Sequence, residues 1–347
     1  MKNIIVIDDN LPYLLNNINF PIGGASVQTK NWIQGFENLG YNIIVISSNN
    51  VKNSSRYTIV VNSTKKSKRS VFLIAFNYFK LIHKYRPEFI YISIPWWSNF
   101  LISIPAKILN VKVVQRISND NLINEESKNR FTEKYKYKLY KISLQLADVF
   151  ICQNDYQMDK LVEKYPRKII EKLYNPFHRR AHKQIVEKRR EYVAWMGLFQ
   201  YQKNLPELLN ITKNLPDINF RIAGNSLSIV DDKTKEALDE LRCMPNVEFV
   251  GLLSREKIYD FLTYAYCLLN TSHVEGFSNT FLEAFSVGTP VVTRRKTDPD
   301  NIVLKNNLGK SVRTYSELSS AIESIVNMPI RSDDLKEYVF NNSGKFF

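Results

Sequence analysis

The chain has 347 residues, which exceeds the size at which one hydrophobic core keeps growing, so two domains are expected. Its 44% hydrophobic and 24% charged residues are ordinary for a globular protein. No apolar run approaches the roughly 18 residues of a membrane span, and the first apolar run is too short for a signal-peptide core. Cys152, Cys243 and Cys267 show no paired or metal-binding spacing, which fits a reducing cytoplasm.

The formal net charge is +14. A nucleic acid, an anionic membrane and a phosphorylated substrate would each suit this excess of positive charge. The chain is also rich in Asn, Lys and Ile, as proteins from AT-rich genomes are, so codon drift is a further explanation. The charge alone does not choose between these explanations.

The first half of the chain alternates continuous apolar runs, which indicate strands buried on both faces, with helical patterns. The expected strands span 3–8, 41–48, 88–94, 111–117 and 147–153, and the expected helices span about 27–40, 71–87, 99–110 and 127–146. The composition of 71–87 predicts a mostly buried helix. Because strands and helices alternate, we expect a parallel sheet with helices on both faces.

The second half begins anew after 173–178 and a basic stretch that runs to Glu191. Its expected strands are 192–197, 218–224, 247–251, 266–272 and 289–294, with helical segments between them. The sequence therefore predicts an α/β protein of two Rossmann-like, doubly wound domains, residues 1–177 and 178–347.

Ligands of open parallel sheets bind outside the carboxyl ends of the strands, so informative residues should directly follow strands. The segments at such places are Gly23-Gly24, Trp96-Trp97, Arg116 to Asp120, Leu198 to Lys203, Gly224-Asn225 and Glu275. No Gly-x-Gly-x-x-Gly follows the first strand, which argues against a nicotinamide or flavin enzyme. The pair Gly23-Gly24 permits either a tight turn or close approach of an anion to helix amides.

The stretch from His273 to Val292 holds two glutamates, Glu275 and Glu283, with seven residues between them. In one interpretation, Thr280 and Glu283 form a capping box at a helix start, and Glu275 is a solvated loop acid. In the other, residues 276–279 form a helix N-terminus whose amides hold a phosphate or a sugar hydroxyl. The two carboxylates would then accept hydrogen bonds from vicinal hydroxyls.

The segment EGFSNTFLEAFSVGTPVV (275–292) resembles the E-x7-E signature of the retaining glycosyltransferases of family 4. Other segments are similar to that family in the same order: the glycine loop, helix and strand at 23–47, the last N-domain strand and its helix at 147–161, the hinge at 174–178 and the phosphate loop at 195–209. The resemblance covers most of the chain. It implies the GT-B fold, in which two Rossmann-like domains face each other across a central cleft, and final residues that pack back toward the first domain.

The resemblance also implies roles for individual residues. Glu275 would reach the transferred sugar, and Lys203 would neutralise the donor diphosphate. Glu283 would hold the donor ribose hydroxyls. The remaining donor-binding set comprises Gly24, Gly251, Leu252, Gly276, Phe277, Ser278, Asn279 and Arg294.

The sequence departs from the family pattern where an arginine normally follows the phosphate-loop glycine, because Leu198 stands there. Either Arg294 or Arg295 substitutes, or the diphosphate binds more weakly. No histidine fits the family's histidine near the reacting carbon, so His83, His178, His182 and His273 are expected to be structural or solvent-facing.

Asp298 and Asp300 have the Asp-x-Asp spacing of a divalent-metal site. The resemblance nevertheless implies a metal-independent enzyme, with the nucleotide-sugar as substrate and no cofactor. Helix amides and Lys203 would already offset the diphosphate charge.

In this family the first domain holds the acceptor, so Trp96, Trp97, Arg116 and Asp120 are the acceptor-side candidates. Adjacent indoles stack sugars or lie at membrane interfaces. Alternatively, one indole is core and the other partly exposed.

Two basic segments of the first domain suit an anionic bilayer: Lys65–Arg69 and the helix over 127–146. The expected apolar face of that helix is Phe131, Tyr135, Leu139, Ile142 and Leu146, and its basic face is Lys134, Lys138 and Lys141. A surface helix that covers a core has the same pattern.

With the resemblance, the sequence predicts a bacterial, cytoplasmic glycosyltransferase that is peripheral on the inner face of the membrane. It would move a sugar with retention from a UDP-sugar to a growing, lipid-linked surface glycan of the O-antigen, capsule or lipopolysaccharide type. Its partners would be donor, acceptor and an anionic membrane, and not nucleic acid. The alternatives are a non-catalytic two-domain sugar-binding protein and a sugar-nucleotide epimerase of the same fold.

Overall fold

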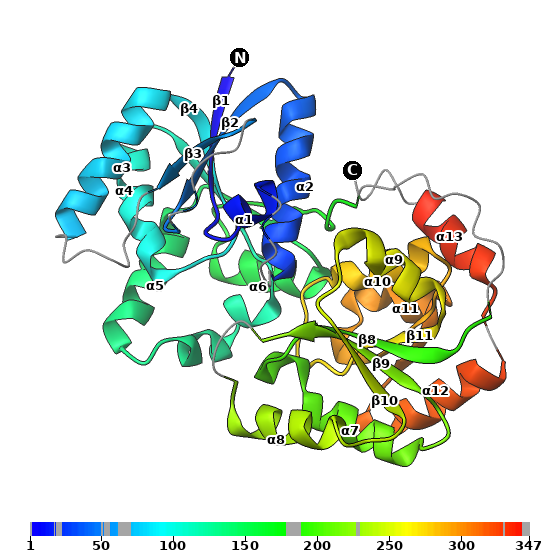
Figure 1. Ribbon diagram of the computed structural model, residues 1–347. Coiled ribbons are helices and arrows are strands. Elements are labelled where there is room, and N and C mark those ends of the chain that lie inside the picture. Colours follow the sequence, from blue (N-terminus) through cyan, green and yellow to red (C-terminus); the bar gives the residue numbers. More distant parts are fainter. Residues whose placement is uncertain are drawn as a thin grey trace. The chain divides into compact units, whose positions relative to one another are not determined.

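The computed structural model describes residues 2–16, 18, 23–49, 51, 56–61, 71–177, 189–226, 230–328 and 330–341. The chain divides into two compact units, Met1–Pro176 and Phe177–Phe347, which we call unit 1 and unit 2. Each unit is built around its own parallel sheet (Figure 1). The division falls within the segment that the sequence suggested as a hinge.

Unit 1 has seven parallel strands in the order β3-β2-β1-β4-β5-β6-β7. The strands are β1 (Lys2–Ile7), β2 (Tyr41–Ser47), β3 (Thr58–Val61), β4 (Pro87–Ile92), β5 (Lys112–Arg116), β6 (Val149–Cys152) and β7 (Ile169–Lys172). The helices are α1 (Leu11–Leu15), α2 (Gly24–Asn38), α3 (Val71–Tyr85), α4 (Phe100–Ile108), α5 (Lys134–Leu146) and α6 (Asp155–Lys164). Short 3-10 turns, η1 (Trp97–Asn99), η2 (Asp120–Leu122) and η3 (Glu125–Arg130), follow β4 and β5.

The alternation of side chains along β1 builds two hydrophobic cores in unit 1. Ile4 and Val6 pack with Ile33 of α2 on one face of the sheet. Ile5 packs on the other face with Ile74 of α3 and the apolar side of α4. Because the chain order reverses between β1 and β4, right-handed crossovers put α2 on one face and α3, α4 and α5 on the other.

Unit 2 has six parallel strands in the order β10-β9-β8-β11-β12-β13. The strands are β8 (Tyr192–Leu198), β9 (Phe220–Asn225), β10 (Val247–Gly251), β11 (Ala265–Leu269), β12 (Val291–Arg294) and β13 (Gly309–Val312). The helices are α7 (Leu205–Asn214), α8 (Asp232–Leu241), α9 (Arg255–Thr263), α10 (Asn279–Ser286), α11 (Ile302–Lys305), α12 (Leu318–Asn327) and α13 (Ser332–Asn341). The 3-10 turns are η4 (Tyr201–Lys203), η5 (Arg295–Thr297), η6 (Pro299–Asn301) and η7 (Tyr315–Glu317).

Unit 2 thus has the doubly wound strand order: successive strands are added on one side of β8 up to β10, and from β11 onward on its other side. The order therefore reverses between β8 and β11. Trp195 and Leu269 on these neighbouring strands belong to one core, together with the apolar faces of α7, α8 and α12. Helix α13 packs against α10 of the same unit, where the rings of Tyr338 and Phe285 meet edge to face. The reversal point is where ligands of such sheets bind.

Three sequence expectations need correction. The helix predicted over 127–146 begins only at Lys134, and η3 precedes it. The strand predicted to be the last of the first domain is followed by another, β7, and two further edge strands, β3 and β13, were not predicted either. Helix α3 is not mostly buried, because the side chains of Val71, Phe72, Leu73 and Phe76 are exposed.

Three further sequence predictions concern residues outside those that the structure describes: the basic segment Lys65–Arg69, and the histidines His178 and His182. Among the described residues, none of the helices has the length and apolarity to cross a membrane.

Candidate functional site

Glu275 lies in the loop that follows β11, and its carboxylate is held by several donors. Its Oε1 atom is 2.5 Å from Nζ of Lys203 and accepts a hydrogen bond of 2.7 Å from the Ser272 hydroxyl. The residue is only 9% exposed. The interpretation of Glu275 as a solvated loop acid is therefore wrong.

Lys203 comes from η4, just after β8, the strand next to β11. Two loops are tied together around it. The Trp195 indole N–H donates to the Thr271 hydroxyl, which in turn donates to the backbone oxygen of Lys203. The Gln202 side chain donates to the Val274 carbonyl. The carboxyl ends of two adjacent strands thus hold a lysine and a glutamate in contact at the reversal point of the sheet.

Glycines give these strand ends their close packing. A Cβ atom on Gly224 of β9 would lie 1.9 Å from the carbonyl oxygen of Gly197 on β8. A Cβ atom on Gly197 would lie 3.3 Å from the aliphatic stem of Lys203. The small residues therefore let the lysine side chain run across the end of β8 toward Glu275.

Glu283 lies in α10, and its side chain is only 3% exposed. Its Oε1 atom is 2.8 Å from Nη1 of Arg255, the first residue of α9. Burial raises the pKa of the Glu283 carboxyl, and the Arg255 guanidinium opposes that shift. The capping-box interpretation is wrong, because the N-cap of α10 is Ser278 and Thr280 lies inside the helix.

The Arg255 contact brings a third loop to Glu283. Gly251 ends β10 with a φ of +71°, a left-handed conformation that favours glycine, and Leu252 follows it. Three residues later Arg255 begins α9. The donor-binding candidates Gly251 and Leu252 thus precede the residue that pairs with Glu283, the carboxylate predicted to hold the ribose.

The residues between the two glutamates form the start of α10. Gly276 and Phe277 are buried in the loop, and the Ser278 hydroxyl is 2.9 Å from that of Thr280. Asn279 is the first residue of the helix. The predicted helix N-terminus is thus present between Glu275 and Glu283.

Arg294 ends β12, and its guanidinium holds the loop that carries Glu275. It donates to the backbone oxygens of Ser272, at 3.0 Å, and His273, at 3.3 Å, and lies 3.7 Å from the ring centroid of Tyr315. The His273 ring also contacts Tyr315, with Nδ1 3.0 Å from the hydroxyl. Leu198, at the place of the family arginine, is half-buried at the end of β8. Arg295 is exposed in η5.

Asp298 is buried, and its carboxylate accepts hydrogen bonds from the amides of Val303 and Leu304. Burial raises its pKa, and these amides oppose the shift. Asp300 has a left-handed backbone in η6. Among the described residues, no three or more His, Cys, Asp or Glu side chains are grouped to hold a metal ion.

Unit 1 carries the predicted acceptor-side residues at the carboxyl ends of β4 and β5. Trp96 is 40% exposed and contacts the tilted ring of Phe131 and the Arg130 guanidinium, whereas Trp97 packs on the core. The alternative of one exposed and one core indole thus describes this pair.

Arg116 and Asp120 both lie in hydrogen-bonded clusters of unit 1. Arg116 is 2% exposed and donates to Asn175 in the hinge segment, and burial lowers its pKa. Asp120 accepts hydrogen bonds from Asn154 and Gln157. Gly24 begins α2, with Gly23 as its N-cap.

Three polar residues at these sites were not anticipated from the sequence. Ser272 and Arg255 contact the two glutamates. Asp8 follows β1 directly and accepts hydrogen bonds from the Ser26 and Thr29 hydroxyls. Asp8 and Ser272 were missed because the predicted strands 3–8 and 266–272 included them, whereas the actual strands end at Ile7 and Leu269. Arg255 begins a helix, so the rule that informative residues follow strands gives no signal for it.

Two doubly wound units, each built on a parallel sheet, define the GT-B class of protein, and the second unit holds Lys203 and Glu275 after strand ends and the buried Glu283 in α10. Family models match both units: "Glycosyl transferase 4-like" over residues 18–154 and "Glycosyl transferases group 1" over residues 178–342. The chain belongs to this group 1, family-4-like glycosyltransferase family.

The chain is also similar to individual proteins. The chain is 28% identical over 156 residues to alpha-galactosylglucosyldiacylglycerol synthase of Streptococcus pneumoniae. The matched region covers 44% of this chain and 41% of that protein. The sucrose-phosphate synthase structure from Thermosynechococcus elongatus has a TM-score of 0.78 at 14% identity, covering 100% and 94% of the two chains. The structure of Anabaena HepE with UDP-glucose has a TM-score of 0.74 at 14% identity, covering 100% and 96%.

The chain spans between 41% and 60% of the length of the curated relatives that it matches first. The structural likeness establishes the fold.

Proposed function

We propose that this protein transfers a sugar, with retention of anomeric configuration, from a UDP-sugar to a growing, lipid-linked surface glycan. The observation that carries the proposal is the buried contact between Lys203 and Glu275 at the reversal point of the unit 2 sheet. Lys203 supplies a cation for a diphosphate, and Glu275, in contact with it, supplies a carboxylate for sugar hydroxyls. The UDP-glucose bound by Anabaena HepE supports the choice of UDP, and the lipid-linked product named for the pneumococcal synthase supports the choice of acceptor.

In the proposed reaction, Lys203 stabilises the charge that develops on the diphosphate as it leaves. Glu275 accepts hydrogen bonds from the transferred sugar, and the amides at the start of α10 add donors to the same region. Glu283 accepts hydrogen bonds from the ribose. Lys203 already forms an ion pair with Glu275 when no donor is bound. A diphosphate that binds there therefore competes with Glu275 for the lysine.

The bond changes need no nucleophile from the protein. The bond between the anomeric carbon and the diphosphate oxygen breaks, and a bond from the acceptor oxygen to that carbon forms on the same side. The acceptor hydroxyl proton passes to the departing phosphate oxygen. The protein contributes positioning and charge stabilisation. We propose that no metal takes part, and the engagement of Asp298 by two backbone amides supports this.

A variant pair tests the proposal against a matched control. Lys203→Met and Glu275→Gln should each lower sugar transfer at least tenfold, because a charged hydrogen bond contributes about 1.5–3 kcal/mol. The control is Lys213→Met and Glu240→Gln, which breaks an exposed pair of the same residue types in unit 2. Equal activity of both pairs of variants would show that the Lys203–Glu275 contact is only structural.

A donor screen separates the proposed enzyme from its rivals. Thermal shift with UDP-, GDP- and ADP-sugars should single out the UDP-sugars. Free UDP should then accumulate only with a suitable acceptor, apart from slow hydrolysis. A UDP-sugar that is epimerised without release of UDP, or bound without turnover in the presence of candidate acceptors, would instead favour an epimerase or a binding protein.

A further inference from the structure

Helices α3, α4 and α5 form one layer on unit 1. All three lie on the same face of the sheet, and α4 packs against both α3 and α5 (Figure 1). We refer to the outward side of this layer as the outer layer face. Helix α6, which follows α5 in the chain, carries three acidic residues, Asp155, Asp159 and Glu163, and so differs in charge from these three helices.

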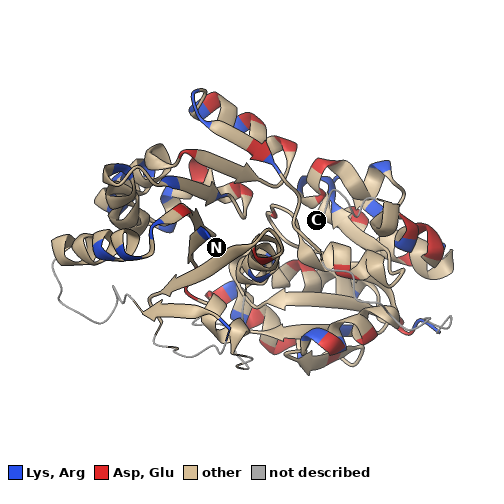
Figure 2. Ribbon diagram, turned by 90° about the horizontal axis from the view of Figure 1, so that it is seen from above, with Lys and Arg blue, Asp and Glu red and all other residues tan. Residues whose placement is uncertain are grey.

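The layer contains no acidic residue at all. Helix α3 has 15 residues, α4 has 9 and α5 has 13, and none of these is Asp or Glu. The same helices hold seven lysines. In Figure 2, α3 shows blue basic residues and tan neutral ones, and no red acidic residue. Acids near the layer occur at its margins, where Asp148 pairs with Lys107 and Glu133 with Lys136. Glu125 and Glu126 are exposed in η3, which precedes α5.

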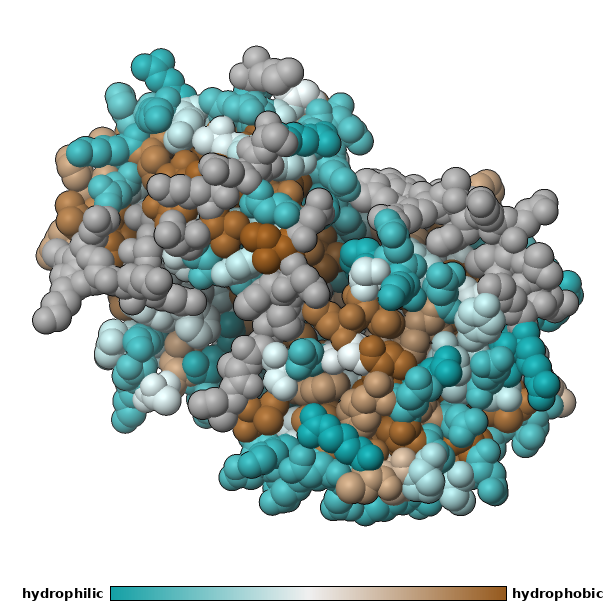
Figure 3. Space-filling view, in the orientation of Figure 1, coloured by the Kyte–Doolittle hydropathy of each residue, from teal (hydrophilic) through white to brown (hydrophobic). Residues whose placement is uncertain are grey.

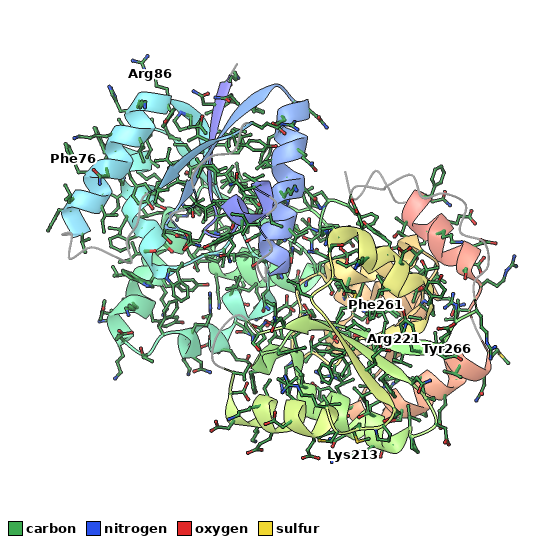
Figure 4. All side chains as sticks on the ribbon, viewed as in Figure 1. Phe76, Arg86, Lys213, Arg221, Phe261 and Tyr266 are labelled. Atoms are coloured by element: carbon green, nitrogen blue, oxygen red, sulfur yellow. The ribbon has the colours of Figure 1, made fainter. Side chains whose placement is uncertain are left out.

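Helix periodicity places apolar side chains on the outer layer face. Ile74, Tyr78 and Ile82 of α3 face the sheet core. Phe72 and Phe76 are each two residues earlier, which is about 200° around the helix and hence on the opposite side. Phe72 is 85% exposed and Phe76 is 51% exposed. Figure 4 shows Phe76 pointing outward from α3.

The other two helices repeat this arrangement. Ile102 and Ala106 of α4 are buried, and Ile104 and Ile108, two residues later, are exposed. In α5, Tyr140 and Leu144 are buried, whereas Ile142 is exposed. Lys138 is also exposed on that side, and Lys80 of α3 lies 4.5 Å from the ring centroid of Phe76. Figure 3 shows brown side chains at the left margin of unit 1, where Figure 1 has α3.

This face differs from the one that the sequence predicted for α5. The predicted apolar face included Leu139 and Leu146, which are half-buried, and the lysines were expected on a separate face. Instead Lys138 and Ile142 lie together on the exposed side. Apolar and basic side chains are therefore interleaved over three helices and are not confined to one.

We propose that the outer layer face docks on the surface of a bilayer that contains anionic lipids. Exposed phenylalanine and isoleucine side chains would enter the headgroup boundary, and the lysines would meet lipid phosphates. A second copy of the chain is a poor occupant, because two acid-free basic faces repel each other. Nucleic acid would use the lysines but leave the phenylalanine and isoleucine side chains unburied.

The outer layer face reaches the carboxyl edge of the unit 1 sheet at the starts of α3 and α5, whereas its Ile108 lies at the far end of α4. Helix α3 begins after β3 at that edge, and α5 begins after β5 at the same edge, so Phe72, Phe76 and Tyr135 lie in the first half of their helices. Ligands of such sheets bind at this edge. Docking here suits a lipid-linked acceptor, although the docking itself does not depend on the proposed sugar transfer.

The test measures binding of the full chain to vesicles without donor or acceptor. The protein should co-sediment with phosphatidylcholine vesicles that contain phosphatidylglycerol, more than with pure phosphatidylcholine, and less as salt is raised. Phe72→Ser with Phe76→Ser should weaken binding at least tenfold, since burial of each ring contributes about tenfold. Lys134→Gln, Lys138→Gln and Lys141→Gln combined should also weaken it at least tenfold.

Matched controls come from unit 2. Phe340→Ser removes a phenylalanine of similar exposure, and Lys233→Gln, Lys235→Gln and Lys257→Gln remove three exposed lysines. Their vesicle binding should match that of the wild type. All the residues that are changed are exposed, so circular dichroism and melting temperature should stay the same.

Several results would overturn the proposal. One is equal binding of the wild type to neutral and anionic vesicles, and another is wild-type affinity of the layer variants. A change of molecular mass with Phe72→Ser and Phe76→Ser would assign the face to self-association. Tighter binding to duplex DNA than to anionic vesicles would assign it to nucleic acid. Because no sugar is present, each of these results leaves the proposed transfer reaction unaffected.

Discussion

The contact between Arg255 and Glu283 makes a prediction about nucleotide binding that can be followed as a function of pH. Glu283 is buried, and Arg255, the partner that opposes the rise of its pKa, is 43% exposed. If Glu283 accepts hydrogen bonds from the ribose, it must be ionised to accept them at both oxygens. Arg255→Gln removes the positive charge and keeps a polar side chain of related shape.

The size of the effect follows from the geometry. A hydrogen bond to a charged group contributes about 1.5–3 kcal/mol. Since water screens the half-exposed Arg255, the lower end of that range applies. About 1.4 kcal/mol corresponds to tenfold, so UDP should bind about tenfold more weakly to the variant at neutral pH.

The pH profile gives the sharper readout. Without Arg255, burial raises the pKa of Glu283 unopposed, so the carboxylate forms at higher pH than in the wild type. The affinity of Arg255→Gln for UDP should therefore still increase with pH where the wild-type affinity has levelled off. Isothermal titration calorimetry across acidic and neutral pH measures both curves.

Two further variants complete the experiment. Arg255→Lys should restore much of the wild-type profile, because it restores the charge. Arg221→Gln breaks an exposed arginine–glutamate pair of the same unit, 2.6 Å in length, and should leave UDP binding unchanged. If Arg255→Gln matches the wild type at every pH, Glu283 does not need this partner to bind the nucleotide, and the reasoning fails.

Three further predictions concern stability and metal dependence. Because burial raises the pKa of Glu283, its contribution to stability is present below its unfolded pKa and lost as pH rises through its folded pKa. Glu283→Gln should then melt above the wild type at neutral pH, with the difference shrinking in acid; an unchanged difference would contradict this account. Gly224→Ala should cost more than about 3 kcal/mol in urea unfolding, since its Cβ meets the Gly197 carbonyl. Gly251→Ala, whose Cβ meets nothing within 4 Å, should cost only about 1–2 kcal/mol through its positive φ. Sugar transfer should continue near its full rate in excess EDTA, and a dead enzyme restored by Mg²⁺ or Mn²⁺ would bring Asp298 and Asp300 back into consideration.

Local sequence patterns were sufficient for most of the strands and for the positions of the candidate residues. Apolar runs such as residues 3–8 and 41–48 mark strands because a strand buried on both faces needs no polar side chain. Glu275 and Lys203 could be identified as residues that follow strands, with the family signature adding their expected roles. The short edge strands β3, β7 and β13 were not predicted, because each has only four residues and is only partly buried.

The contacts between these residues depend on which strands become neighbours, and no local pattern specifies that. Lys203 and Glu275 are 72 residues apart in the chain, and they meet because β8 pairs with β11. The partner of Glu283 is Arg255, the first residue of α9. Arg116, at the end of β5, donates a hydrogen bond to Asn175, which is 59 residues away in the chain. These pairings arise from tertiary packing.

Helix α3 shows the same limit for a surface. Its sequence is apolar almost all round, so its periodicity could not tell which side would meet the sheet. Packing against β-strands and α4 buries Ile74, Tyr78 and Ile82 and leaves Phe72 and Phe76 in water. An excess of apolar residues is visible in the sequence, but the neighbours that cover them are chosen by the order of strands in the sheet, which arises only when distant segments pair.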